Sequence, residues 1–290
     1  MNLSKPSWLK VKLPSHPNFF HVSELVKKNG LNTICQSARC PNIAECWTAR
    51  TATFLILGNI CTRGCAFCAV KKGVPGPPRP EEPERVAEAV KILGLKHVVL
   101  TSVTRDDLPD GGAGHFAETA RRIRWRVKPI SIEVLIPDFK GSREALRAVI
   151  DSRPEVINHN VETVPRLYPE VRPQARYERS LDILRWVKEE NSTIASKSGL
   201  MVGLGETPGE VLGVMDDLRK NGCEILTIGQ YLAPSPGHHP VVEYVNPERF
   251  AYFKQEGVAR GFSAISSGPL VRSSFHAGES YQEAAGARTP

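Results

Sequence analysis

The spacing of the cysteines restricts what this chain can be more than any other feature. Six of its seven cysteines form two groups of three: Cys35, Cys40 and Cys46, then Cys61, Cys65 and Cys68. The seventh, Cys223, stands alone and is expected to be a small buried hydrophobe. Structural zinc sites and ordinary four-iron four-sulfur clusters use four protein ligands. Each triplet therefore indicates an open coordination position or a fourth ligand from elsewhere in the chain.

The second triplet directly follows Thr53–Leu57, an apolar segment typical of a short buried strand. Three thiolates on one loop can hold three irons of a cubane cluster and leave the fourth iron open to a small molecule. A zinc site would need paired CxxC or Cys/His elements, which neither triplet offers. A disulfide framework is not expected, because the N-terminus lacks the apolar core of a signal peptide and 290 residues need no such staples.

The run Cys61-Thr-Arg-Gly-Cys65-Ala-Phe-Cys68 resembles the signature of the radical S-adenosylmethionine superfamily. In that superfamily S-adenosylmethionine chelates the open iron, and one electron from the cluster releases a 5'-deoxyadenosyl radical. The spacing of the first triplet narrows the resemblance to the lipoyl synthase family. The resemblance continues across almost the whole chain in residues 101–112, 133–138, 158–163, 226–232 and 272–277.

The resemblance implies that the first triplet holds a second, auxiliary cluster and that Ser274 is its fourth ligand. A serine oxygen is a harder ligand than a thiolate, which suits a cluster sacrificed as a sulfur source. Without the resemblance, Ser273 and Ser274 would be ordinary loop or helix-cap hydroxyls. His276 is then either a surface histidine or an alternative ligand, and we favour the surface. Phe275 departs from the family, which commonly has tyrosine there.

Apolar runs of strand length alternate with helical patterns along most of the chain. The expected strands are Thr53–Leu57, His97–Ser102, Ser131–Leu135, Glu155–Asn158, Gly199–Val202, Ile225–Ile228 and Phe262–Ile265. The expected helices include Pro83–Leu93, Ala113–Arg126, Glu178–Glu190 and Pro208–Lys220. Repeated βα units predict an α/β fold with parallel strands and an active site at their carboxyl ends. The units are too few for eight strands, so a partial (β/α)6 TIM-like barrel of the radical S-adenosylmethionine type fits better.

Three segments follow from this pattern. Residues 1–50 are expected to be a loop-rich N-terminal extension with the auxiliary-cluster cysteines. Residues 51–268 are expected to form the partial barrel, and residues 269–290 a C-terminal segment that supplies the serine ligand. Pro75–Pro80 is expected to connect the cluster loop to the first barrel helix.

Polar residues at the expected strand ends are candidates for binding S-adenosylmethionine: Ser102, Thr104, Glu133, Asn158, Asn160 and Arg176. Glu133 lies within an apolar strand and needs a partner if buried, which a ribose diol or a barrel arginine would supply. Arg176 is compatible with the methionyl carboxylate and with plain solvation. Lys197 and Gly203–Gly205 are weaker candidates.

The chain carries 38 Lys and Arg against 31 Asp and Glu, a net charge of +7. Such a balance suits either nucleic acid or an acidic protein partner. The densest basic run, Arg121–Arg126, would spread around a helix, and no RNA-binding module accompanies it. We therefore expect no nucleic-acid partner. We also expect no membrane association, because the apolar runs are too short to span a bilayer, and a cytoplasmic location, because free cysteines need a reducing compartment.

The resemblance implies an enzyme with two [4Fe-4S] clusters and S-adenosylmethionine. It implies insertion of two sulfur atoms at C6 and C8 of an octanoyl chain on a lysine of a lipoyl-carrier domain. The carriers would be glycine cleavage H protein or the E2 subunit of 2-oxoacid dehydrogenases, with flavodoxin or ferredoxin as electron donor. Two alternatives are an RNA methylthiotransferase, which would carry an RNA-binding appendage, and an electron carrier, which needs no open iron.

Overall fold

The structure is a computed structural model that describes residues 4–11 and 13–288. The chain folds into two compact units. Of the described residues, the unit called N-terminal here comprises residues 11, 13–63 and 69–157, and the unit called C-terminal comprises residues 4–10, 64–68 and 158–288. Each unit contains parallel strands covered by helices.

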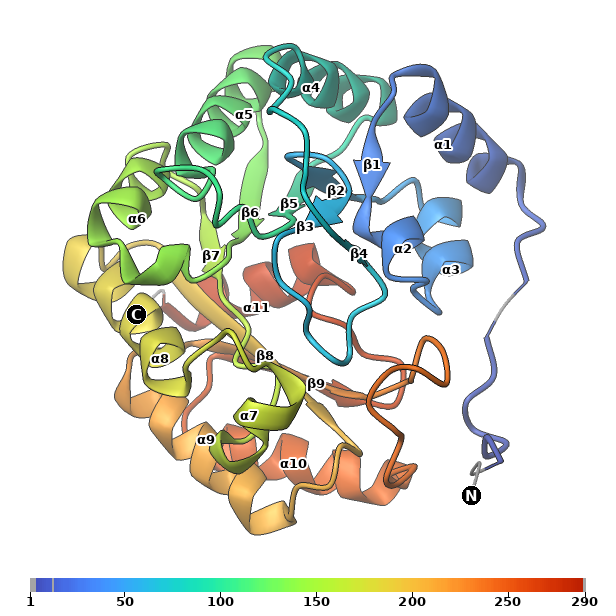
Figure 1. Cartoon of the computed structure of the whole chain (residues 1–290), viewed down its shortest axis with the longest axis vertical. Coiled ribbons are helices and arrows are strands. Elements are labelled where there is room, and N and C mark those ends of the chain that lie inside the picture. Colours follow the sequence, from blue (N-terminus) through green and yellow to red (C-terminus); the bar gives the residue numbers. More distant parts are fainter. Residues whose placement is uncertain (1–3, 12, 289–290) are drawn as a thin grey trace. The chain divides into compact units, whose positions relative to one another are not determined.

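The N-terminal unit begins with α1 (Pro17–Lys28), β1 (Asn32–Thr33), α2 (Ile34–Ser37) and α3 (Ile43–Thr48). The βα elements that follow are β2 (Thr53–Ile56), α4 (Glu82–Leu93), β5 (His97–Ser102), α5 (Ala113–Arg126), β6 (Ser131–Leu135), the 3-10 turn η1 (Phe139–Gly141), α6 (Arg143–Ile150) and β7 (Val156–Asn158). The strand order is β1-β2-β5-β6-β7. Strands β2, β5 and β6 are parallel, whereas β1 is antiparallel to β2. Helices α4 and α5 pack against each other (Figure 1).

The C-terminal unit contains η2 (Pro165–Leu167), α7 (Tyr168–Val171), α8 (Tyr177–Glu190), β8 (Ala195–Val202), α9 (Pro208–Lys220), β9 (Ile225–Gln230), α10 (Pro247–Ala259), β10 (Ala264–Gly268) and α11 (Ala277–Arg288). Strands β8, β9 and β10 are parallel neighbours in that order. Thr207 and Glu210 form a capping box at the start of α9, which satisfies backbone N–H groups that the first helical turn leaves free.

The two faces of β8–β10 differ in composition. One face contributes Leu200, Leu226 and Ile228 to an apolar core with α9 and α10. The opposite face carries Gly199, Thr227, Gly229 and Ser266, because adjacent residues of a strand point to opposite sides. The Ser266 and Ser280 hydroxyl oxygens are 3.5 Å apart, so α11 lies on this small-residue face (Figure 1).

All seven expected strands are present, and β5 and β6 have the expected bounds. Helices α5 and α9 also match, and residues 73–80 connect the cluster loop to α4 without regular structure. The expectation of a loop-rich extension was wrong, because α1, α2 and α3 are all helical. Helix α1 has twelve residues, whereas α2 and α3, with four and six residues, are too short to produce a recognisable helical period.

Candidate cluster and S-adenosylmethionine site

The first triplet lies on the two short helices α2 and α3 and the turn between them. Cys35 is in α2, Cys46 is in α3, and the Cys40 N–H donates to the Cys35 carbonyl at 2.9 Å. Burial raises the pKa of the Cys46 thiol to about 12, and the neighbouring Cys35 and Cys40 contribute to the rise. Burial also raises the pKa of Cys35. Three sulfurs that interact in one small region suit an iron-sulfur cluster, whose binding would release the thiol protons.

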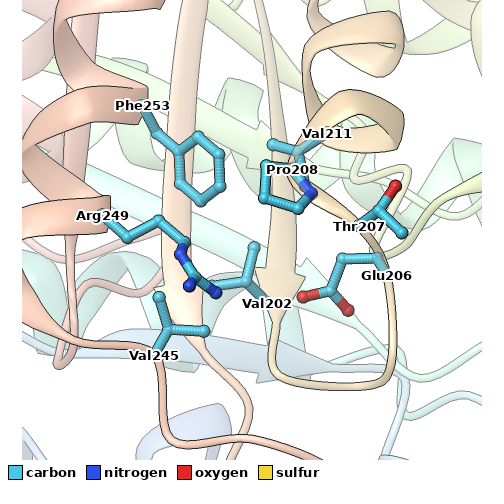
Figure 2. Close-up of a pocket in the computed structure, with 8 residues that line it drawn as sticks. All are labelled: Val202, Glu206, Thr207, Pro208, Val211, Val245, Arg249 and Phe253. Carbon is cyan, nitrogen blue, oxygen red and sulfur yellow. The ribbon is translucent and has the colours of Figure 1, made fainter.

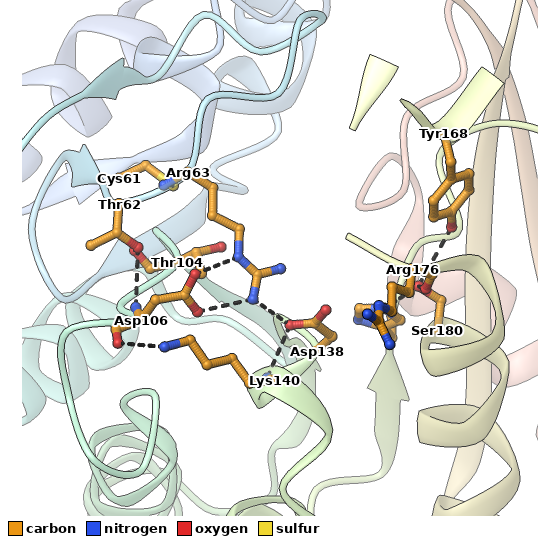
Figure 3. Close-up of polar contacts among 11 residues, drawn as sticks. Cys61, Thr62, Arg63, Thr104, Asp106, Asp138, Lys140, Tyr168, Arg176 and Ser180 are labelled. Atoms are coloured by element: carbon orange, nitrogen blue, oxygen red, sulfur yellow. Dashed lines mark hydrogen bonds and ion pairs between the residues drawn. The ribbon is translucent and has the colours of Figure 1, made fainter. Parts of the chain in front are cut away.

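The second triplet begins at Cys61, in the short two-stranded sheet of β3 (Ile60–Cys61) and β4 (Lys71–Lys72). The next residue is fixed to the loop after β5. The Thr62 N–H and hydroxyl donate to the Thr104 carbonyl at 3.0 and 2.9 Å, and the Thr62 oxygen accepts the Asp106 N–H at 3.0 Å (Figure 3). Thr104, expected to bind S-adenosylmethionine, therefore supports the cluster loop through its backbone carbonyl.

Arg63 in the cluster loop is held by both its backbone and its side chain. Its backbone N–H donates to the Cys61 sulfur at 3.4 Å. Its guanidinium donates to the two carboxylate oxygens of Asp106 at 2.6 and 2.9 Å and to Asp138 at 2.7 Å (Figure 3). Burial acts to lower the pKa of Arg63, but the two carboxylates outweigh it and raise the pKa. Arg63 thus remains a cation although it is only 7% exposed.

The later half of the cluster loop is bound within the C-terminal unit. The Ala66 N–H donates to the Val171 carbonyl, and the His239 N–H donates to the Ala66 carbonyl, each at 2.9 Å. The His238 ring nitrogen Nε2 lies 3.2 Å from the Cys68 carbonyl oxygen. Phe67, which precedes the last cysteine of the triplet, packs against the apolar core of this unit. Backbone hydrogen bonds and one aromatic side chain therefore fix this half of the loop.

Two charged residues near this loop were missed by the sequence reasoning. Arg172 is 9% exposed, donates to the carbonyls of Asn160 and Val161 at 3.0 Å each, and interacts electrostatically with Cys65. Glu162 accepts a hydrogen bond from the Asn160 amide at 3.1 Å, and its burial raises its pKa. Glu162 lies within residues 158–163, one of the stretches that carried the family resemblance. That resemblance could therefore have identified Glu162 as a candidate.

In the N-terminal unit the expected S-adenosylmethionine residues do not converge. Val99 is in register with Glu133, and Thr101 with Leu135, so these side chains share one face of the sheet. Ser102 follows Thr101 and belongs to the opposite face. Glu133 is fully buried, and its Oε2 lies 3.8 Å from the His97 Nε2. A histidine therefore lies within ion-pair distance of this buried carboxylate.

The Ser102 hydroxyl is buried, and within the described part of the chain it neither donates nor accepts a hydrogen bond. Such a group is costly to bury unless a ligand pairs with it. In the C-terminal unit the Asn160 Oδ1 is likewise buried without a hydrogen-bond partner among the described residues. It sits beside Gly199, where an added Cβ would lie 2.9 Å from it and 2.5 Å from the Thr227 hydroxyl. The Ser102 hydroxyl and the Asn160 Oδ1 are thus two buried oxygens that fit a polar cofactor.

Asn158 and Arg176 occupy different environments. Asn158 is fully buried at the end of β7. Arg176 is exposed at the start of α8, where its carbonyl accepts a hydrogen bond from the Ser180 hydroxyl at 3.3 Å (Figure 3). Its guanidinium is thus accessible, as binding of a carboxylate would require. Lys197 is fully buried within β8.

The Gly203–Gly205 turn adjoins a small pocket at the end of β8. The lining residues are Val202, Glu206, Thr207, Pro208, Val211, Val245, Arg249 and Phe253 (Figure 2). The Glu206 carboxylate accepts the N–H groups of Gly203 and Leu204 at 2.6 and 3.0 Å. Gly203 has φ +96°, and a Cβ there would collide with Gln230. Packing and backbone conformation therefore explain why glycine occupies position 203, without requiring a role in cofactor binding.

Ser274 lies in the segment between β10 and α11 and is half-buried. It lies within a turn, in which the Phe275 N–H donates to the Arg272 carbonyl at 3.0 Å. His276 is exposed, and its Nδ1 lies 2.5 Å from Glu279, as expected for a surface histidine. Cys223 is fully buried, and burial raises its pKa to about 12, as expected for a small hydrophobe.

The basic run Arg121–Arg126 is largely compensated by nearby carboxylates. Its ion pairs include those of Arg121 with Glu118, Arg122 with Glu118 and Glu84, Arg124 with Glu155, and Arg126 with Glu84 and Glu88. Within residues 4–11 and 13–288, no helix has the length and apolar composition needed to cross a bilayer. In the same residues, no three His, Cys, Asp or Glu side chains are grouped closely enough to hold a single metal ion.

Comparison with known proteins assigns the chain to a family. The model of the Radical SAM superfamily matches residues 55–218. Lipoyl synthase of Caldanaerobacter subterraneus is 57% identical over 277 residues, covering 96% of this chain and 97% of that protein. Lipoyl synthase of Rubrobacter xylanophilus is 55% identical over 280 residues, covering 97% of this chain and 87% of that protein. The chain belongs to the lipoyl synthase family.

Solved structures support the fold of this lipoyl synthase family member. Methylornithine synthase has a TM-score of 0.56 and 13% identity, with 90% of this chain and 85% of that chain covered. HydG, a maturase of the [FeFe]-hydrogenase, has a TM-score of 0.56 and 15% identity, with 86% and 68% covered. The predicted α/β fold of the radical S-adenosylmethionine type is therefore confirmed.

The predicted enzyme class is confirmed as well: a member of the lipoyl synthase family with a Radical SAM domain is a radical S-adenosylmethionine enzyme. This class uses a [4Fe-4S] cluster and S-adenosylmethionine. The full-length relatives favour this assignment over an RNA methylthiotransferase or an electron carrier.

Proposed function

We propose that this enzyme inserts sulfur at C6 and C8 of an octanoyl chain carried on a lysine of a lipoyl-carrier domain. The observation that carries the proposal is the pair of cysteine triplets in a chain that matches lipoyl synthases over nearly its whole length. One triplet accounts for the radical chemistry of the superfamily. The other has no role in that chemistry and is available as the source of sulfur.

In this proposal Cys61, Cys65 and Cys68 hold the cluster that binds S-adenosylmethionine. Cys35, Cys40 and Cys46 hold the auxiliary cluster, and Ser274 completes its ligand set. When bound, the first cluster would supply the electron that generates a hydrogen-abstracting radical, and the auxiliary cluster would supply sulfide. The mutual electrostatic influence of Cys35, Cys40 and Cys46 supports the auxiliary site, because it requires the three thiols to be near one another.

The chain's own residues orient the cofactor. From the candidate group we assign Ser102, Asn158, Asn160 and Arg176 to the ribose and amino acid parts of S-adenosylmethionine. Thr104 instead supports the cluster loop, and Glu133 lies near His97. Asn160 and Glu162 form a neutral and an acidic acceptor side by side, which suits a diol. The guanidinium of Arg176 suits a carboxylate. Ser102 would contribute its orphaned hydroxyl.

The partners follow from the reaction. The cluster on the second triplet needs an electron donor before it can generate the radical, and we propose flavodoxin or ferredoxin as that donor. The octanoyl chain would arrive on glycine cleavage H protein or an E2 subunit, and the excess of basic residues favours an acidic carrier. All seven cysteines are free of disulfides, which supports a reducing compartment, the cytoplasm.

The test is anaerobic reconstitution with iron and sulfide, followed by S-adenosylmethionine, dithionite and an octanoyl-lysyl peptide. Mass spectrometry should show a peptide that has gained two sulfur atoms, together with released 5'-deoxyadenosine. A protein that carries both clusters but yields neither product would refute the enzymatic proposal. Deoxyadenosine with an unchanged peptide would refute the substrate alone.

Two variants separate the clusters. Cys40→Ala should abolish sulfur insertion and lower the bound iron, while deoxyadenosine still forms because the second triplet is intact. Ser274→Ala should keep most of the iron but lose sulfur insertion. Full sulfur insertion by Ser274→Ala would contradict its role as a ligand that the cluster needs for turnover.

A further inference from the structure

Arg63 joins three parts of the N-terminal unit. Its backbone is in the cluster loop, Asp106 is in the loop after β5, and Asp138 follows β6. The side chains are tightly enclosed, with exposed fractions of 6% for Arg63, 22% for Asp106 and 1% for Asp138. A buried cation that donates to two carboxylates has little freedom to move, because breaking any of these bonds would leave a buried charge unpaired.

The carboxylates are themselves held in place. The Lys140 N–H donates to Asp138 Oδ1 at 3.1 Å, and its ammonium group donates to the Asp106 carbonyl at 3.0 Å. The Asp106 N–H donates to Thr62, the neighbour of Arg63. The network of Arg63, Asp106, Asp138 and Lys140 therefore closes on itself and fixes the position of the Arg63 backbone.

The fixed Arg63 backbone N–H points at a cluster ligand. It donates to the Cys61 sulfur at 3.4 Å, within the limit for a hydrogen bond to sulfur. Hydrogen bonds to ligating sulfurs and nearby charges set the reduction potential of iron-sulfur clusters. A donated N–H favours the reduced cluster, which carries more negative charge. A nearby carboxylate disfavours the reduced cluster.

We propose that Arg63, Asp106 and Asp138 are positioning residues that set the reduction potential of the cluster on Cys61, Cys65 and Cys68. This inference rests on the proposed function, because it requires a cluster at that triplet. Arg63 raises the potential by its charge and by holding the N–H that bonds to Cys61. Asp106 and Asp138 anchor Arg63 and lower the potential by their charge, so the two kinds of residue act with opposite signs.

The experiment is a dithionite redox titration of the full chain, followed by electron paramagnetic resonance of the reduced cluster. Cys35, Cys40 and Cys46 are replaced by Ala in every sample so that a single cluster gives the signal. Asp138→Asn keeps the shape and one acceptor oxygen but removes a negative charge, and it should raise the midpoint potential. Arg63→Gln should lower it. At a fixed solution potential, each change should alter the ratio of reduced to oxidised cluster about tenfold. This corresponds to a shift of the midpoint potential of about 59 mV for one electron.

Glu118→Gln is the matched control, because it also removes one carboxylate from an arginine pair in the same unit. That pair is exposed on α5, with side-chain exposures of 37% for Glu118 and 60% for Arg121. The midpoint potential of the cluster in Glu118→Gln should equal that in the parent. Equal potentials for Asp138→Asn, Arg63→Gln and the parent would overturn the inference and leave the network a purely structural role.

Two further measurements keep the test decisive. If Arg63→Gln fails to fold, as judged by circular dichroism, Arg63→Lys retains the charge without the two-pronged donor and should give a potential below the parent. If the parent binds no iron at the second triplet, the proposed function fails first. If iron binds and the potentials do not move, the proposed function stands and only this inference fails.

Discussion

Gly229 gives the sharpest test of how the segment that carries Ser274 is placed. Gly229 lies in β9, hydrogen-bonded between β8 and β10. A Cβ at this position would lie 3.1 Å from the Val271 carbonyl carbon and from an Arg272 guanidinium nitrogen. The Val271 carbonyl oxygen would be closer still, well below the 3.0 Å that real Cβ atoms essentially never cross. The backbone of the Val271 segment therefore occupies the space where a side chain would be.

Gly229→Ala should displace that segment rather than the strand, because β9 is held by neighbours on both sides. The Val271 carbonyl must retreat until its oxygen is at least 3.0 Å from the new Cβ, and to 3.4 Å for ordinary contact. Overpacking of this kind costs about 1–3 kcal/mol of the free energy of unfolding. Because Ser274 follows two residues after Arg272, we expect the serine oxygen to lose its place on the auxiliary cluster.

The assay combines thermal unfolding, limited proteolysis and Mössbauer spectroscopy of the reconstituted protein. Gly229→Ala should melt at a lower temperature, be cleaved faster near residues 269–276, and lose the signal of an oxygen-ligated iron. Gly213→Ala in α9 is the control, because its Cβ would meet nothing within 4 Å. The control should be about 0.5–1 kcal/mol more stable, since alanine favours helix interiors. Unchanged proteolysis and iron signal in Gly229→Ala would refute the reasoning.

Three other predictions concern separate features. Gly199→Ala should crowd Asn160 and weaken S-adenosylmethionine binding about tenfold, or about 1.4 kcal/mol. Isothermal titration calorimetry of the reconstituted protein would measure this, and unchanged affinity would show that Asn160 is not in the binding site. Glu210 has a pKa lowered to about 2, mainly by its hydrogen bond from Arg166. The stability it provides is complete above its unfolded pKa of about 4.3 and is lost as pH falls toward 2, so the melting-temperature difference between the parent and Glu210→Gln should shrink over that range. A constant difference would show that the charge is irrelevant. Cys223→Ala should leave the iron content unchanged, and Cys223 should react with iodoacetamide more slowly than Cys61 in the metal-free protein, as peptide mass spectrometry would detect; equal labelling rates would contradict its burial.

The sequence located the candidate cluster residues without help from the structure. Both triplets are recognisable because cluster ligands are fixed in type and lie close together along the chain. The parallel strands were recognisable because strands buried on both faces are continuous apolar runs, as in His97–Ser102 and Ile225–Ile228. Short helices escaped detection: α2 and α3 contain too few turns for a hydrophobic period, so the first triplet was expected in a loop.

Only the tertiary structure decided which residues support the site. Arg63 bonds to carboxylates 43 and 75 positions away, and both lie in loops that follow neighbouring parallel strands. Gly229 makes room for Val271, which is far along the chain. Local sequence patterns report strands, helices and ligand types because these depend on adjacent residues. They cannot report such pairings, because the partner of a buried charge is set by the order of strands in the sheet.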